Sequence, residues 1–395
     1  MKISDIEQNE CCGCSACINA CPKSAISVQT DKQGFLYPQI DNSNCIDCGI
    51  CYKVCKQSLE HKYPVLKCYA AKNTNLEVVM SCSSGGVVDA FCKTILNEHG
   101  VVYGAGYNEN FELVYKKART IDECHSFRGS KYVQANPGKV YEEILTDLKS
   151  NVKVLYIGPS CYVAGLRSFL EQRKCDENNL YTIDFICHGV PSPGVFAKYV
   201  QFVNQDNTLK DIIFRNKKDK NGEKMPVPWK FGNYNCALVY KNGRREVNTL
   251  KTRIFLNLFT SNNCLRPHCY CCDFIGTAKA GDITVADYWG IEKVHSDFAD
   301  NYGVSAVMIH TMKGQSLFEN THNIDCIKSS VEKISLKQGM LRAASPKGEC
   351  YDEFWNDFYN NDFSYIAKKY GDYSFMGMVR HSKLYSLYSR IRYGE

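Results

Sequence analysis

Apolar residues follow two different periods along this chain, and the change of period predicts where strands and helices lie. Continuous apolar runs or a two-residue period, typical of strands, occur at 65–71, 101–107, 113–118, 152–157, 180–186 and 282–287. A helical period that collects apolar residues on one face occurs at 87–97, 163–173, 194–204 and 254–259. The pattern predicts a mixed fold that contains both helices and strands.

The clearest alternation occupies the middle of the chain, where strand, helix, strand and helix follow one another between residues 152 and 204. This order predicts parallel strands joined by right-handed crossovers. Cys161 and Cys187 each follow one of the two strands. We therefore expect both cysteines at the carboxyl edge of the sheet, where open α/β sheets bind ligands.

Other segments have weaker patterns. Residues 57–67 are polar, contain Pro64 and predict a linker. Residues 205–250 are polar and irregular, which predicts a surface excursion or β-hairpins. Beyond residue 325 the pattern is mainly helical.

The first 60 residues are dominated by cysteine instead of by apolar periodicity. Two runs share the spacing C-x2-C-x2-C-x3-C, and they comprise Cys11, Cys14, Cys17 and Cys21, then Cys45, Cys48, Cys51 and Cys55. This spacing is typical of [4Fe–4S] ligation, in which the fourth cysteine of each run binds the other cluster. The sequence therefore predicts two clusters, one held by Cys11, Cys14, Cys17 and Cys55 and the other by Cys45, Cys48, Cys51 and Cys21.

Two features adjoin this pattern without changing it. Cys12 sits beside a ligand and is interpreted as a bystander, and Lys56 replaces the proline that often follows such a run. Zinc ribbons favour separated C-x2-C pairs, and disulfides need no such regularity, so iron–sulfur clusters are the preferred interpretation.

The predicted fold class is an α+β ferredoxin-like module, followed by an α/β domain with a partly parallel sheet and a helical C-terminal region. The expected boundaries are 1–60 for the module, 66–150 and 151–330 for two parts of the α/β region, and 331–395 for the C-terminal extension.

A third redox centre is predicted from cysteines outside the module. Cys264, Cys269 and Cys272 follow a C-x4-C-x2-C spacing, and Cys187 completes the preferred set of four. Cys161 competes for a place in that set. A zinc site or a redox-inactive thiol cluster remains the alternative.

Composition and charge narrow the function classes. The 395 residues include 23 cysteines, no apolar run reaches membrane-spanning length, and the polar start lacks the features of a signal peptide. Thiols in this number indicate a reducing, cytoplasmic setting. The formal charge of +6 would be offset by bound thiolates, so nucleic-acid binding is not expected. Residues 379–393 predict a basic amphipathic helix, interpreted as solvated, with membrane or partner contact as the alternative.

Six blocks occur in an order that resembles a known family: 84–88, 128–134, 158–167, 184–193, 266–274 and 281–290. Together they are similar to the coenzyme F420 hydrogenase/dehydrogenase beta-subunit family, here placed behind a two-cluster ferredoxin. The resemblance implies a flavin, usually FAD, in the α/β domain. It further implies that Ser84, Gly85 and Gly86 approach the flavin with backbone amides at a helix start. Contacts to the flavin are also implied for Arg128, Gly129, Ser130 and Lys131.

The predicted function is that of an iron–sulfur flavoprotein oxidoreductase, which passes electrons between [4Fe–4S] clusters and a flavin acting on a small organic substrate. His188, beside Cys187, is a candidate proton donor, with a neutral strand-end histidine as the alternative. No G-x-G-x-x-G fingerprint follows a strand, so a redox partner protein or a reduced deazaflavin is preferred over NAD(P)H. The competing hypothesis is an electron-transfer subunit without its own substrate site.

Overall fold

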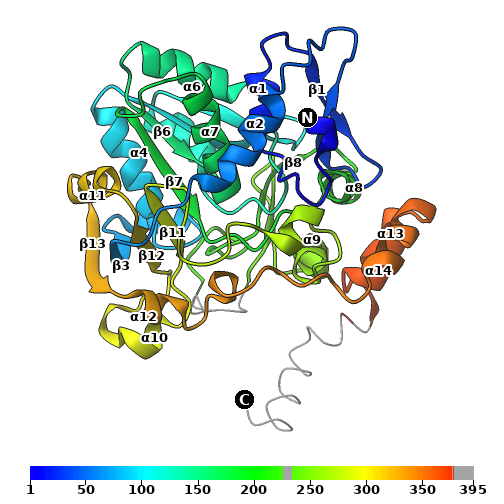
Figure 1. The fold of residues 1–395 in the computed structure, drawn as a ribbon. Coiled ribbons are helices and arrows are strands. Elements are labelled where there is room, and N and C mark those ends of the chain that lie inside the picture. The colour runs from blue at the N-terminus through cyan, green and yellow to red at the C-terminus, as the bar shows by residue number, and fades with distance from the viewer. Residues whose placement is uncertain (226–233, 376, 378–395) are drawn as a thin grey trace.

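A central sheet of eight strands organises the computed structural model, which describes residues 1–225, 234–375 and 377 (Figure 1). Its strand order is β13-β3-β12-β11-β7-β6-β4-β5. The strands are β3 (Lys67–Asn73), β4 (Val101–Tyr107), β5 (Leu113–Ala118), β6 (Val154–Ile157), β7 (Leu180–Phe185), β11 (Ile283–Asp287), β12 (Ser305–Ile309) and β13 (Ile324–Ser329). The pairs β4–β6, β6–β7 and β7–β11 are parallel, whereas the other four pairs are antiparallel. The predicted partly parallel sheet is confirmed.

The middle of the sheet is apolar because helices cover both of its faces (Figure 1). Every residue of β12 is buried, and only the last residue of β6 is half-exposed. The covering helices include α4 (Val87–Asn97), α6 (Val140–Lys149), α7 (Ser160–Gln172), α8 (Pro193–Val203) and α11 (Met312–Glu319). Strands that are buried on both sides carry continuous apolar runs, which is why the sequence pattern located them.

Helix α7 begins three residues earlier than the apolar pattern predicts. Pro159 is its N-cap, with φ −65° and an extended ψ of 154°, so the helix starts at Ser160 immediately after the turn that ends β6. Cys161 consequently lies in the first turn of α7 and not in a loop.

The region beyond residue 300 contributes two strands that the apolar pattern did not predict. β12 lies between β11 and β3, and β13 pairs with β3 at the edge of the sheet. The β13 side chains are mostly exposed or half-exposed, so its sequence carries little apolar signal. The expectation of a mainly helical chain beyond residue 325 is therefore wrong for 325–329, because backbone pairing with β3 outweighs local pattern there.

Residues 205–250 form a separate three-stranded antiparallel sheet in the described part of this segment, in agreement with the predicted hairpins. Its strands are β8 (Leu209–Ile213), β9 (Ala237–Tyr240) and β10 (Arg245–Val247). The segment is not only a surface excursion, since Arg215, Asn216 and Lys217 are buried against the main domain.

The cysteine-rich module packs directly onto the α/β domain (Figure 1). It consists of η1 (Ile3–Asp5), α1 (Ala16–Ala20), β1 (Ile26–Thr30), β2 (Leu36–Ile40), α2 (Ile50–Gln57) and η2 (Ser58–Glu60). Helices α1 and α2 both contact α7. Ile18 and Val54 belong to the same hydrophobic core as Leu166, and Ser168 Oγ of α7 donates to the Val54 carbonyl at 2.7 Å. The module is thus joined to the domain by shared core packing.

The remaining described helices connect or extend these parts. They are α3 (Leu76–Ser81), α5 (Ile121–Cys124), η3 (His125–Phe127), α9 (Leu250–Thr260), η4 (Pro267–Cys271), α10 (Ile291–Val294), η5 (Ser296–Phe298), α12 (Val331–Ser335), η6 (Gly339–Leu341), α13 (Tyr351–Asn360) and α14 (Phe363–Tyr370). The predicted helix at 379–393 lies outside the described residues. Among the described helices, none has the length and apolar character needed to cross a membrane.

The central sheet draws strands from both parts of the predicted α/β region. β3, β4 and β5 come from residues 66–150, and the other five strands come from later in the chain. These two segments therefore build one sheet.

Candidate metal centres and cofactor site

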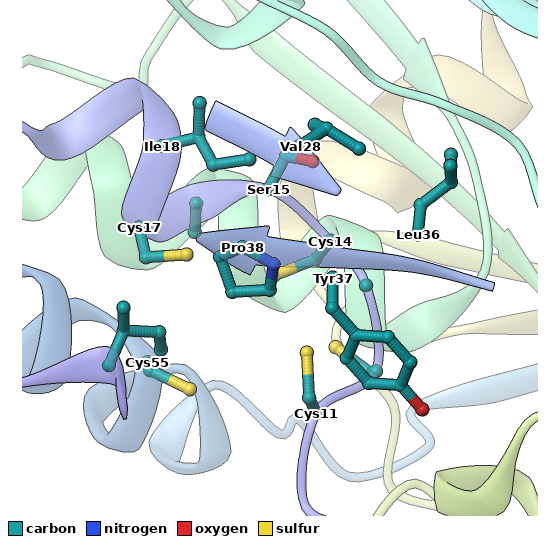
Figure 2. Close-up of a pocket in the computed structure, with 14 residues that line it drawn as sticks. Cys11, Cys14, Ser15, Cys17, Ile18, Val28, Leu36, Tyr37, Pro38 and Cys55 are labelled. Atoms are coloured by element: carbon teal, nitrogen blue, oxygen red, sulfur yellow. The ribbon is translucent and has the colours of Figure 1, made fainter. Parts of the chain in front are cut away.

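Five cysteines of the module line a single pocket (Figure 2). Four of them, Cys11, Cys14, Cys17 and Cys55, are the set that the crossed ligation pattern predicts for one cluster, and the fifth is Cys12. The pocket encloses about 430 Å³ of space free of protein atoms, part of it continuous with solvent. The apolar side chains Ile18, Val28, Leu36 and Pro38 complete its wall.

The loop before α1 takes its shape from two left-handed residues. Gly13 has φ +81° and Ser15, the N-cap of α1, has φ +62°. A Cβ on Gly13 would lie 2.4 Å from Gln134 Nε2, so only glycine fits where this loop packs against the domain. The loop can therefore carry three cysteines to one pocket within seven residues.

The chemistry of this pocket suits a metal cluster. Burial raises the pKa of the Cys17 thiol, and it raises the pKa of Cys55 to about 12. These groups would stay protonated in an empty apolar pocket, whereas iron binds them as thiolates. We conclude that the donor set fits a [4Fe–4S] cluster, whose iron ions would supply the positive charge that stabilises the thiolates.

The second predicted set lies closer to solvent. Cys48 is exposed, and Cys21, Cys45 and Cys51 are half-buried. Ala25 N donates a hydrogen bond to Cys21 Sγ at 3.3 Å. The two predicted cluster sets of the module thus differ in depth, and the set of Cys11, Cys14, Cys17 and Cys55 faces the α/β domain.

A third group of cysteines gathers at the carboxyl edge of the parallel strands. Cys161 lies in the first turn of α7, Cys187 follows β7, and Cys269 and Cys272 lie in and just after η4. A hydrogen bond with Cys12, burial, and the nearby Cys272 and Cys187 raise the pKa of Cys161. Burial, followed by the charge of Cys272, raises the pKa of Cys187 to about 11. Burial and then Cys187 raise the pKa of Cys269.

The structure puts Cys264 elsewhere. Its Sγ donates to the Leu258 carbonyl of α9 at 3.4 Å, inside the hydrophobic core. Leu265, the next residue, forms a β-bridge with Pro191, which fixes the chain direction at this point. Cys161 therefore replaces Cys264 in the candidate set, since spacing along the chain does not report which way a side chain points.

Cys12 connects the two groups of thiols. It lines the module pocket, and its hydrogen bonds with Cys14 and Cys161 hold its pKa well below the usual range. Cys12 is interpreted from the sequence as a bystander, but it lies between the inner module pocket and the third cysteine group.

The residues predicted around the flavin occupy two adjoining loops. Gly86 is the N-cap of α4 with φ +75°, and Ser84 Oγ donates to the Val304 carbonyl. Gly85 is confined by packing, because a Cβ there would lie 2.7 Å from the Ala71 carbonyl oxygen and 2.9 Å from Ser305 N. This loop lets α4 begin against strands β3 and β12.

The second loop carries positive charge. Arg128 Nε pairs with Asp89 Oδ1 at 2.6 Å, and Lys131 Nζ donates to the Arg128 and Gly129 carbonyls. Ser130 N and Oγ both donate to Ser83 Oγ, which joins this loop to the first one. Burial lowers the pKa of Lys131 to about 8.

A buried lysine that the sequence did not reveal belongs to the same region. Lys217 Nζ donates to the carbonyls of Val79 and Ser84, and burial lowers its pKa to about 7. Neighbouring Arg215 pairs with Asp287 Oδ2 at 3.5 Å and lies over the rings of Tyr234 and Trp289. Lysines that donate to backbone carbonyls beside the start of α4 fit an anionic group such as a flavin diphosphate. Lys217 lay in a polar run that gave no sign of burial.

His188 lies between the third cysteine group and an aromatic side chain. Its Nε2 is 2.7 Å from Asn262 Oδ1, and its ring meets Phe259 edge-on at 4.9 Å between centroids. Burial lowers its pKa, so the ring is neutral at pH 7. Because Asn262 Oδ1 accepts only, we assign the proton to Nε2.

Two segments of the chain match family models of known proteins. Residues 10–58 match the family model of the 4Fe-4S dicluster domain, and residues 151–334 match the family model for the C terminus of the coenzyme F420 hydrogenase/dehydrogenase beta subunit. No curated protein matches the chain. A similar solved structure is a chain of the F420-reducing [NiFe] hydrogenase complex from Methanosarcina barkeri, with 15% identity and a TM-score of 0.47 over 71% of this chain and 91% of that chain. The protein therefore combines a 4Fe–4S dicluster domain at residues 10–58 with a region, residues 151–334, that is similar to the C terminus of coenzyme F420 hydrogenase/dehydrogenase beta subunits.

Proposed function

We propose that this protein is an iron–sulfur flavoprotein oxidoreductase, which passes electrons between [4Fe–4S] clusters and a flavin that reduces or oxidises a small organic substrate. The observation that carries the proposal is the packing of the inner module pocket on α7, where a Cβ on Gly165 would lie 2.7 Å from Cys14 Sγ. Because Cys161 lies in the first turn of the same helix, the inner pocket and the third cysteine group lie close together.

The cysteine sets define an order from surface to interior. Cys21, Cys45, Cys48 and Cys51 would hold the outer cluster, and Cys11, Cys14, Cys17 and Cys55 the inner one. Cys161, Cys187, Cys269 and Cys272 would hold the third cluster at the edge of the sheet. The exposure of Cys48 favours electron exchange with a redox partner at the outer set.

The flavin would lie where two loops and a buried lysine converge. Lys131 and Lys217 would neutralise its phosphates, and the amides at the start of α4 would donate to them. Arg128 would hold the second loop in place through Asp89. FAD bound there supplies the exchange between one-electron and two-electron chemistry.

His188 would hold a proton beside the third cysteine group. Its neutral ring keeps Nε2–H on Asn262 and leaves Nδ1 to accept or relay a proton.

We propose the cytoplasm as the compartment of the protein, because thiolate clusters persist in a reducing setting. The substrate class includes a deazaflavin of the F420 type, a sugar-linked intermediate or a tetrapyrrole.

Cofactor analysis of the anaerobically purified full chain tests the proposal. We expect iron and acid-labile sulfide for three clusters, together with one FAD per chain and flavin bands above the broad cluster absorption. Clusters without flavin, even after incubation with FAD, would contradict the flavoprotein assignment and favour a pure electron-transfer subunit. An iron content that accounts for only two clusters would contradict the proposed third cluster.

A further inference from the structure

We infer that Arg266 tunes the reduction potential of the inner module cluster. It donates a hydrogen bond to the Cys11 sulfur and holds a positive charge beside that sulfur. The inference rests on the proposed binding of a cluster by Cys11, Cys14, Cys17 and Cys55. It adds a positioning residue from the α/β domain, 255 positions away in sequence from the cysteine that it contacts.

The guanidinium of Arg266 reaches across the boundary between the module and the domain. Nε donates to the Cys11 carbonyl at 2.7 Å, and Nη2 donates to Cys11 Sγ at 3.4 Å. Nη1 donates to Gln134 Oε1 at 3.0 Å. The guanidinium also lies over the Tyr37 ring, with 4.1 Å between its carbon and the ring centroid. These contacts fix the group beside one particular sulfur.

The charge of Arg266 acts on the carboxylate of Asp31 only at longer range, since the two groups form no ion pair. The residue is fully buried, with 0% of its surface exposed. In the described ranges 1–225, 234–375 and 377, no acidic side chain forms an ion pair with it. Its polar partners are a carbonyl, an amide and a thiol. A buried, permanently charged arginine without a carboxylate is costly unless another anion compensates it.

A thiolate-bound cluster is the anion that this site offers. Four thiolates around a cubane give a net negative centre, and reduction adds one further negative charge. Arg266 is therefore attracted more strongly to the reduced state than to the oxidised state. Hydrogen bonds to cluster sulfurs and nearby charge are established determinants of such potentials. The arginine should raise the midpoint potential of the inner cluster.

Gln134 allows the charge to be changed without removing the arginine. Its Oε1 accepts from Arg266 Nη1 and from Leu36 N at 3.2 Å. Gln134→Glu keeps the shape and the oxygen that accepts both hydrogen bonds, and it places a carboxylate against the guanidinium. It should cancel much of the charge felt at Cys11.

The experiment is an anaerobic redox titration of the full chain followed by electron paramagnetic resonance, which separates the clusters by potential. For Arg266→Gln we expect the reduction equilibrium of the inner cluster to shift at least about tenfold, about 59 mV more negative for one electron. Arg266→Lys should give a smaller shift, because it retains charge but loses the planar fork. Gln134→Glu should shift the same cluster in the same direction.

Arg173→Gln provides the matched control. Arg173 Nη2 also crosses from α7 to the module, where it donates to the Asn19 carbonyl at 3.2 Å and not to a cysteine sulfur. Its removal should leave every potential unchanged.

Two results would overturn the inference. One is an unchanged inner-cluster potential in both Arg266→Gln and Gln134→Glu, with iron content intact. The other is an equal shift in all clusters, which would indicate general loosening. If Arg266→Gln does not fold, Gln134→Glu decides the matter alone. Absence of the inner-cluster signal in the unmodified chain would instead reject the proposed ligand set, so the two failures are distinguishable.

Discussion

Cysteines that lie close together in this sequence can have side chains that point to different parts of the fold. Cys269 shares a buried edge of the sheet with Cys187, whereas Cys264, five residues earlier, turns back into the core toward Leu258. We therefore propose that only Cys269 and Cys272, of these three residues within nine positions, belong to the third centre. Direction of the side chain, set by the surrounding fold, separates ligands from buried hydrophobes.

The third centre can be tested by paired serine substitutions. Cys269→Ser should lose the iron of one cluster, since serine replaces a proposed thiolate ligand. Cys264→Ser should retain all iron, with a modest loss of stability from a polar group in the core. Iron and sulfide per chain are the measurement. Equal iron in both variants, or loss in Cys264→Ser alone, would refute the revised ligand set.

Lys217 predicts a dependence of stability on pH. Its folded pKa of about 7 lies below the usual 10.5, so between these values the unfolded chain binds more protons than the folded one. The free energy of unfolding of the flavin-free protein should therefore rise with pH across this window. Below pH 7 both states are protonated and the full penalty of burying the charge remains.

Lys217→Met should remove this rise and increase the unfolding free energy near pH 7 by on the order of a few kcal/mol. Urea unfolding of flavin-free protein at pH 7 and pH 9 provides the measurement. Lys220→Met, at an exposed position of the same segment, is the control and should leave the pH dependence unchanged. A parallel pH dependence in Lys217→Met and the unmodified chain would count against the burial argument.

At the scale of elements, close backbone contacts decide how the module meets the domain. Ser192 is the N-cap of α8, and its Oγ accepts from Gly194 N and Val195 N while it donates to the Gln33 carbonyl of the module. One side chain thus caps a domain helix and anchors the β1–β2 turn. Local periodicity cannot predict this contact, because Ser192 and Gln33 lie 159 residues apart in the sequence.

Gly34 makes a close approach to the backbone of the α/β domain at this boundary. Its φ is +86°, and a Cβ there would lie 2.5 Å from Gly194 Cα. Gly34→Ala should destabilise the docked module by about 3 kcal/mol, which combines left-handed strain with overpacking. Gly222→Ala isolates the strain, since Gly222 has φ +88° and nothing within 4 Å of the added atom. Urea unfolding of cluster-loaded protein should show a clearly larger loss for Gly34→Ala, and equal losses would reject the packing argument.

At the scale of the whole molecule, the depth of the cysteine sets orders the proposed electron path. The set that contains the exposed Cys48 is outermost, and the set that contains Cys14 and Cys17 is buried against the domain. Shared core packing between α1, α2 and α7 keeps the inner set next to Cys161. The path depends on this docking and not on either part alone.

Loss of the outer cluster tests the order. Cys48→Ser should lose the iron of one cluster and slow reduction by a protein donor steeply, because none of the cysteines in the other two sets is exposed. Dithionite should still reduce the inner and third clusters at equilibrium. Stopped-flow reduction by a small ferredoxin gives the rate, with Cys271→Ser as the control at an exposed cysteine outside every set. An unchanged rate in Cys48→Ser would reject uptake of electrons at the outer set.

The sequence by itself determined the features that depend on local order. The doubled cysteine spacing, the helix at 87–97 and the strands at 101–107 and 113–118 follow from residues close along the chain, and the structure reproduces those three elements without change. Spacing and periodicity report contacts within a few turns or one strand, and these need no distant partner.

Only the tertiary structure decided which distant groups meet. It placed Cys161 in the third cysteine group and turned Cys264 into the hydrophobic core. It also buried Lys217 beside the loop before α4, placed Cys12 between the two groups of thiols, and set Arg266 against Cys11. These outcomes depend on chain direction and on burial by segments more than a hundred residues away. A local pattern contains neither quantity, because both arise when the module, the sheet and the η4 segment pack together.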